Sequence, residues 1–332
     1  MTGSTDSPGG LQIVVENLSD EGARLLAAGI ESSGDGGALA QLIGSVTNAL
    51  RPEDRAKTRL VITGDLVATV NAREDRTGTP FTMERGAGVV AAKTMPPNAD
   101  GFVDILIPVY WLLPLESAQE TAEQSGLIQH LAAHEAVHAS IHHIGDEPFD
   151  LHDREEFGYA SMNFVSMASE QIEEHLAEYL GSQVTGREVE QSASNVEASI
   201  EAWQETLATE LPAISEDDPD YFQRGMLATF NALHILWKTL AYLAAALRTE
   251  EGFRPVPSEI AMLPGWRQHI EPWWDRYVEL LGDIPMTVEV DIAATDEVVR
   301  EMGLHLQTWA DELGFDFHDT PQGGFFRIKL WD

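Results

Sequence analysis

The chain has 332 residues, 43% of them hydrophobic, and its 55 acidic against 20 basic residues give a formal net charge of −35. This length and apolar content predict a globular protein of one or two domains. Because like charges repel, the acidic excess argues against nucleic acid and anionic membranes as direct partners. The acidic residues are spread along the chain, so we expect a solvated acidic surface. The more specific alternative is an acidic surface that mimics DNA and binds a DNA-binding protein.

The chain contains no cysteine, which excludes disulfides and thiolate metal sites. Any metal must therefore be held by His, Asp or Glu. The first ten residues lack the basic and apolar segments of a signal peptide, and the most apolar stretch, 102–115, is interrupted by Asp104, Pro108 and Pro114. Neither a signal peptide nor a membrane span is predicted, and we expect a cytoplasmic protein.

The first 115 residues alternate between strand and helix patterns. A β-branched run predicts a strand over 11–17, and capping residues precede a helix over 19–32. A second helix is expected to end before Pro52. Residues 59–72 predict a hairpin that turns at Gly64 and Asp65. Two more strands are predicted, at 87–94 and at 102–113.

Long helical patterns begin after Leu115. They extend approximately over 116–143, 161–183, 195–210, 219–249 and 262–281. The chain then continues with a predicted strand at 286–291, a helix at 295–313 and a hairpin around Pro321–Gly324. The fold class predicted from this order is α+β, with a mixed N-terminal portion followed by a mostly helical body.

The segment with the most specific chemistry is His134-Glu135-Ala136-Val137-His138, an H-E-x-x-H pattern within a predicted helix. At about 100° per residue, side chains four positions apart share one face, so both imidazoles can reach one ion. Glu135 lies on the neighbouring flank, where it can act on a water held by that ion. An accidental match in a chain rich in His and Glu is the alternative. It would need partners for all three buried polar groups.

A third ligand is expected from the next helix, where Glu174 is followed by Ala177 and Glu178 in an E-x-x-A-E pattern. A carboxylate from this helix completes a His₂Glu zinc site with one open position. Glu178, one turn further on, can accept a hydrogen bond from a ligand histidine. Glu170, Glu174 and Glu178 share one helix face, so Glu170 and Glu178 remain alternatives to Glu174 as the ligand. The simpler interpretation is that the three carboxylates form an acidic stripe exposed to solvent.

These two motifs resemble those of the gluzincin metallopeptidases, whose second motif reads E-x-x-A-D or E-x-x-A-N. The resemblance covers roughly residues 100–183. It implies Glu174 as ligand and Glu178 as the group that orients a histidine, although Glu replaces the usual Asp or Asn. It also implies that the segment 102–113 lies along an extended substrate. The expected organisation is a mixed region at 1–100, a zincin-like region at 101–285 and a C-terminal region at 286–332.

We therefore expect a zinc-dependent hydrolase that cleaves a peptide bond in a peptide or protein substrate. Zn²⁺ polarises the carbonyl and lowers the pKa of its water toward about 7, and Glu135 passes the proton to the leaving amine. Two other classes stay open. One is a regulatory or partner-binding protein that retains the zinc scaffold with little or no proteolytic activity, and the other is an acidic interaction protein.

The remaining polar and aromatic candidates are less specific. His142 and His143 are expected to end the active helix, and His152 to lie in a loop. The sequence does not choose among four candidate oxyanion donors, Tyr221, His234, Tyr242 and His269. The aromatic cluster Trp266, Trp273, Trp274 and Tyr277 is expected to be core or interface packing.

Overall fold

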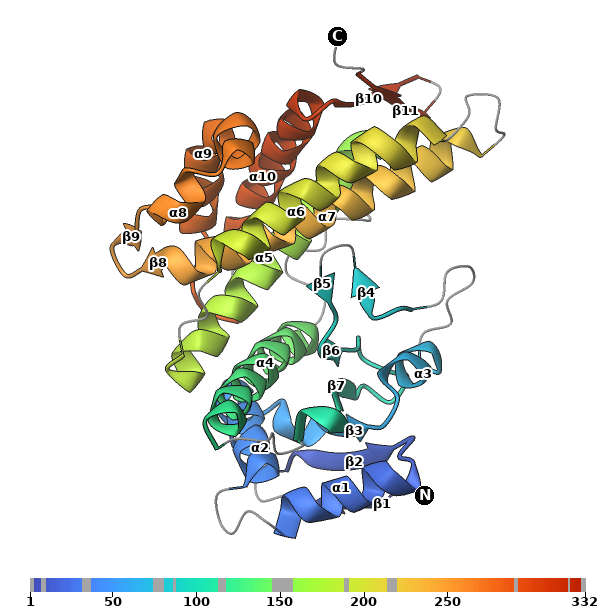
Figure 1. Ribbon diagram of the computed structural model, residues 1–332, viewed down its shortest axis with the longest axis vertical. Helices are drawn as coiled ribbons and strands as arrows, with labels where there is room; N and C mark the ends of the chain where they lie inside the picture. The colour runs from blue at the N-terminus through green and yellow to red at the C-terminus, as the bar shows by residue number, and fades with distance from the viewer. Residues whose placement is uncertain are drawn as a thin grey trace. The chain divides into compact units, whose positions relative to one another are not determined.

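The computed structural model has an α+β fold with a small mixed sheet in the N-terminal part and a helical body, as the sequence predicts (Figure 1). The residues that the structure describes are 3–6, 10–31, 37–73, 81–85, 88–112, 118–144, 158–187, 191–213, 220–289, 292–321 and 323–329.

The chain divides into two compact units. Unit 1 consists of Met1–Arg85, Val89–Glu147 and Ala177–Val189, and unit 2 of Gly86–Gly88, Pro148–Leu176 and Glu190–Asp332. The division falls inside helix α5 (Tyr159–Thr185), which continues without a break from unit 2 into unit 1. The compact units thus cut across the expected regions 1–100, 101–285 and 286–332, which stay a prediction about chain organisation.

Unit 1 contains a five-stranded sheet in the order β1-β2-β3-β7-β6. Strands β2 (Gln12–Glu16), β3 (Thr58–Thr63) and β7 (Val103–Pro108) are parallel, whereas β1 (Gly3–Asp6) and β6 (Lys93–Thr94) pair antiparallel at the two edges. Successive side chains of a strand point to opposite faces. Leu60 and Ile62 accordingly enter one core cluster and Val61 the other, so both faces of the sheet are covered.

Helices cover this sheet on both sides. The larger cluster joins the sheet to α1 (Asp20–Glu31), α2 (Ala38–Ala49) and α4 (Ala118–Ile144), and the smaller one includes α3 (Leu66–Asn71). Ala132, Ala136 and Ala139 place the small-residue face of α4 in the larger cluster. This packing fixes one face of α4 and leaves the adjoining face for polar side chains.

The predicted hairpin over 59–72 is wrong, because α3 follows β3. The Asp65 side chain accepts a hydrogen bond from the Ala68 N–H and so begins a helix. A Cβ at Gly64 would lie 2.3 Å from the Asn17 carbonyl oxygen, which shows how closely the chain passes the end of β2. With β2 and β7 on its two sides, β3 has no place for an adjacent second hairpin strand.

Unit 2 consists mainly of helices: the first part of α5, α6 (Ala193–Glu205), α7 (Tyr221–Leu247), α8 (Ser258–Ala261), α9 (Glu271–Gly282) and α10 (Ile292–Glu312). Short helical turns occur at Thr206–Glu210, Leu211–Ala213 and Trp266–Ile270. Two hairpins complete the unit, β8 (Arg248–Thr249) with β9 (Gly252–Phe253), and β10 (Phe315–Thr320) with β11 (Gly323–Ile328). Trp266, Trp274 and Tyr277 are buried, so most of the predicted aromatic cluster is core.

Three other strand predictions need correction. Residues 286–289 form bends instead of a strand, because the Thr287 and Glu289 N–H groups bond locally to Pro285 and to the Thr287 hydroxyl; 290 and 291 lie outside the described residues. The strand expected at 87–94 is reduced to β5 (Gly88–Val89), which pairs with β4 (Glu84–Arg85), and to β6. The segment expected at 102–113 becomes β7 followed by a turn of 3₁₀ helix at Val109–Leu112.

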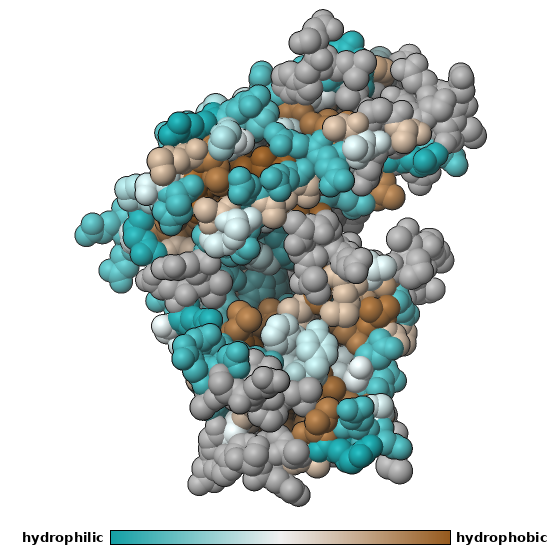
Figure 2. All heavy atoms as spheres, in the orientation of Figure 1, coloured by the Kyte–Doolittle hydropathy of each residue, from teal (hydrophilic) through white to brown (hydrophobic). Residues whose placement is uncertain are grey.

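One described helix, α7, is long and apolar enough over Arg224–Leu247 to cross a membrane on length and composition alone. Of its most apolar 18 residues, 56% are buried inside the protein, which the core helix of a globular protein also shows. The visible face in Figure 2 has hydrophilic side chains over both units, with smaller apolar patches among them.

Candidate metal centre

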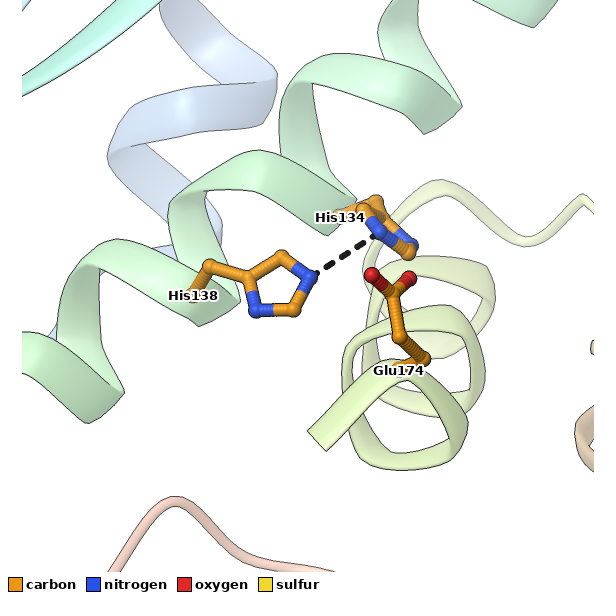
Figure 3. A group of neighbouring side chains, drawn as sticks. All are labelled: His134, His138 and Glu174. Atoms are coloured by element: carbon orange, nitrogen blue, oxygen red, sulfur yellow. Dashed lines mark hydrogen bonds between the residues drawn. The ribbon is translucent and has the colours of Figure 1, made fainter. Parts of the chain in front are cut away.

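His134 and His138 lie one turn apart on α4, with their Nε2 atoms 3.2 Å apart (Figure 3). His134 is 5% exposed and His138 is half-buried. A tetrahedral zinc ion with bonds of about 2.0–2.1 Å separates two ligand atoms by roughly 3.3 Å. The two imidazoles thus already have the separation that one ion requires.

Glu174 completes a group that could hold a metal. One ligand atom from each of His134, His138 and Glu174 lies within 4.8 Å of the others, and among the described residues no other group of three or more His, Asp or Glu meets this criterion. In Figure 3 the Glu174 carboxylate points toward the His134 ring. Three ligands leave one coordination position for water or substrate.

Glu178 fixes the orientation of His134. Its Oε1 lies 3.0 Å from His130 Nε2 and its Oε2 lies 3.1 Å from His134 Nδ1. Burial raises the pKa of the Glu178 carboxyl, but the hydrogen bonds from His130 and His134 outweigh burial and lower it to about 2. An ionised carboxylate only accepts hydrogen bonds, so His134 donates from Nδ1, and Nε2 is the ring nitrogen that could bind a metal.

The part of α5 that contacts His134 is close in sequence to Glu174. Glu178 belongs to the part of α5 that packs in unit 1, and Glu174 precedes it by one helical turn. Gly181, one further turn along, lies against the His134 backbone, where an added Cβ would be 3.0 Å from the amide nitrogen. Within unit 1, α5 thus packs closely on α4 at Gly181 and Glu178.

Glu135 is 8% exposed and is tied to the edge strand of the sheet. Its Oε2 lies 2.7 Å from the Thr94 hydroxyl of β6, which also lies 2.7 Å from the Glu135 carbonyl oxygen. A hydroxyl has a single proton, so the two oxygens share it. The contact with Thr94 therefore restrains the Glu135 side chain through one carboxylate oxygen.

Within unit 2, both oxygens of Glu174 contact α7. Lys238 Nζ donates to Oε1 at 2.5 Å, and the Tyr242 hydroxyl donates to Oε2 at 2.6 Å. His234, one turn before Lys238, pairs with Glu170 through Nδ1 at 2.9 Å. Of the four candidate oxyanion donors, Tyr242 is the one that the described contacts connect to Glu174, and His234 contacts Glu170.

The other sequence candidates take structural positions or lie outside the described part of the chain. Glu170, considered as an alternative ligand, has a side chain 53% exposed and a histidine partner. His143 contacts the Thr58 hydroxyl at 3.0 Å, and His269 packs on Trp203. His152 lies outside the described residues, as does the side chain of Tyr221.

The chain matches no protein-family model, no curated protein and no solved structure. The resemblance to gluzincins therefore stays a prediction that rests on the two motifs.

Four residues around the centre were not identified from the sequence: His130, Thr94, Lys238 and Gly181. His130 could have been found, because it precedes His134 by four residues and so shares its helix face. Gly181 lies on α5, one turn after Glu178, but its close approach to α4 depends on how the two helices pack. Thr94 and Lys238 contact Glu135 and Glu174 from elements distant in sequence. Their residue types and spacing give no signal before those elements are packed.

Proposed function

We propose that the chain is a metal-dependent hydrolase in which His134, His138 and Glu174 hold a zinc ion and Glu135 is the general base. The observation that supports this most strongly is the position of Glu174. It follows His138 by 36 residues, on another helix, and comes within 4.8 Å of both imidazoles. An accidental H-E-x-x-H motif gives no reason for a carboxylate, or for an orienting Glu178, at these positions.

When bound, the metal supplies a Lewis acid that polarises the scissile carbonyl and acidifies water. Glu135 takes a proton from the attacking water and delivers it to the leaving nitrogen. Thr94 keeps one Glu135 oxygen in place and so limits the orientations of the carboxylate. Glu178 maintains the His134 tautomer, and Tyr242 positions Glu174 by donating its hydroxyl proton to Oε2.

A peptide bond in an extended chain is the proposed substrate. In the segment 102–113, β7 pairs with β3 on one side and, at Ile105 and Leu106, with β6 on the other, so strand addition is blocked at those two residues. The edge strand β6 is the better candidate, since it is last in the sheet order and its Thr94 contacts Glu135. A peptide paired along an edge strand is held extended by main-chain hydrogen bonds.

The metal is tested by elemental analysis of protein purified from metal-replete medium. Wild type is expected to contain about one zinc per chain, and His134→Ala and His138→Ala to contain little. His234→Gln, which alters a half-buried histidine outside the centre, is the matched control and should retain zinc. Equally low zinc in wild type and in all variants would remove the proposal.

The reaction is tested with Glu135→Gln, which keeps the size of the side chain but cannot take a proton. Turnover of a mixed peptide library should fall by about 10³–10⁴ while zinc content and thermal melting stay near wild type. Zinc in wild type without cleavage of any peptide in the library would instead favour a scaffold that binds metal without catalysing hydrolysis.

A further inference from the structure

Glu174 is shared between the metal centre and a cation of the protein itself. Lys238 Nζ lies 2.5 Å from its Oε1, and the side chains of Lys238 and Glu174 are 36% and 13% exposed. The two residues are on neighbouring helices of unit 2, α7 and α5. A metal ion that uses Glu174 must therefore bind a carboxylate that already pairs with an ammonium group.

Two physical effects of this pair act in the same direction. The Lys238 ammonium competes with the metal ion for the Glu174 carboxylate oxygen. Its positive charge also repels a divalent cation bound to the same carboxylate. The repulsion is only partly screened, because the carboxylate is mostly buried. Both effects weaken metal binding.

Lys238 could also strengthen metal binding by holding Glu174 in place. This effect is small, because Tyr242 holds Glu174 as well. Its hydroxyl donates to the other Glu174 oxygen at 2.6 Å without adding a charge. Lys238 and Tyr242 are one turn apart on α7, so both approach Glu174 from the same face. If Lys238 lost its charge, Glu174 would still be positioned by Tyr242.

We propose that Lys238 is an internal counter-ion of the metal centre, which lowers the affinity of His134, His138 and Glu174 for divalent cations. This inference rests on the proposed metal site and concerns its regulation. Without metal, the Lys238 ammonium neutralises the charge of Glu174, the third ligand. With metal bound, the ammonium either leaves Glu174 or stays and is repelled by the ion. Occupancy of the centre then depends on free metal concentration instead of being permanent.

The experiment is a titration of the metal-free full chain with Zn²⁺ in competition with a chromophoric chelator. Lys238→Met removes the charge and keeps a similar stem, and Lys238→Arg keeps the charge. We expect the zinc dissociation constant to fall at least about tenfold in Lys238→Met, equivalent to about 1.4 kcal/mol, and to change less than about threefold in Lys238→Arg. The difference should shrink in high salt.

Tyr242→Phe and circular dichroism melting of every sample complete the design. Tyr242→Phe should weaken zinc binding, because it loosens Glu174 without removing a positive charge. Unchanged or weaker binding in folded Lys238→Met, alongside zinc binding by wild type, would overturn the role of Lys238 and leave the metal site standing. Absence of zinc binding in wild type and Lys238→Met alike would overturn both. Zinc binding by Lys238→Met alone would support the counter-ion.

Discussion

Gly181 of α5 lies directly against His134 of α4, with room for no side chain between them. A Cβ at Gly181 would be 3.0 Å from the His134 amide nitrogen and 3.2 Å from its Cα, closer than ordinary van der Waals contact. Glu178, one turn before Gly181, bonds to the ring of the same histidine. The backbone and the imidazole of His134 are thus both fixed by α5.

Gly181→Ala is expected to reduce metal affinity more than stability. The added methyl group pushes α5 from His134 by a few tenths of an ångström, while alanine in a helix gains about 1 kcal/mol over glycine. We expect about a tenfold loss of zinc affinity and a melting temperature within a few degrees of wild type. Gly44→Ala is the matched control, because a Cβ at Gly44 meets nothing within 4 Å. It should stabilise α2 and leave zinc affinity unchanged, and an equal loss of affinity in both variants would contradict the role given to Gly181.

The three carboxylates on one face of α5 should respond differently to alanine. Glu174→Ala removes a ligand and is expected to lower zinc affinity by more than about 100-fold. Glu178→Ala should lower it by about 10–100-fold, because it orients His134 without touching the ion. Glu170→Ala should have little effect, since that side chain is exposed and pairs with His234. Chelator competition gives all three dissociation constants, and equal values would show that the row is only a solvated acidic face.

Thr94→Val should impair turnover without removing the metal. The substitution preserves the shape of the side chain and deletes the hydrogen bond to Glu135 Oε2. A hydrogen bond of this kind contributes about 0.5–1.5 kcal/mol, so we expect up to about a tenfold loss in kcat. Thr94→Ser retains the hydroxyl and should restore most of the rate. Parallel measurement of zinc content separates a mispositioned base from a lost metal, and full activity in a zinc-loaded Thr94→Val would rule out this role.

Acid should destabilise unit 2 through His305. Burial lowers the pKa of His305, and the charge of Arg276 lowers it further, against the hydrogen bond to the Trp273 carbonyl oxygen. The folded pKa lies below the unfolded value of roughly 6.5, so the unfolded state binds more protons between the two values. The stabilising contribution is therefore complete above about pH 6.5 and is lost as pH falls through the folded pKa.

The measurement is chemical unfolding between pH 5 and 8 for wild type and His305→Gln, which retains a donor for Trp273. The difference in unfolding free energy between the two proteins should shrink as the pH falls, because Gln does not titrate. A difference that is constant with pH would show that His305 has the same pKa in both states.

The sequence was sufficient for elements that depend on local pattern. Helix α4 was predicted because an unbroken alanine-rich segment favours helix, and β2 because of its β-branched run. The prediction of a hairpin at Gly64 is wrong because Asp is common both at the start of a helix and in a turn, so the local sequence does not distinguish the two. Only the parallel neighbours of β3 decide between the two.

The same distinction holds at the candidate centre. His134 and His138 were predictable from helical spacing, and Glu174 and Glu178 from the second motif. Thr94 and Lys238 were not, because strand β6 and helix α7 approach the centre from distant parts of the sequence. The groups that tune a site from outside its motifs depend on tertiary packing, and a single sequence gives no account of it.

Helix α5 belongs to two compact units, which has a consequence for how the protein unfolds. Its first part packs in unit 2, and its last part, with Glu178 and Gly181, packs in unit 1. Melting of either unit would fray a helix that the other uses, so we expect the two unfolding transitions to be coupled. Trp111 is in unit 1, whereas the other described tryptophans, at positions 203, 237, 266, 273, 274 and 309, belong to unit 2. Tryptophan emission, which comes mostly from unit 2, would therefore be expected to change when zinc binding at the histidines of unit 1 stabilises α5.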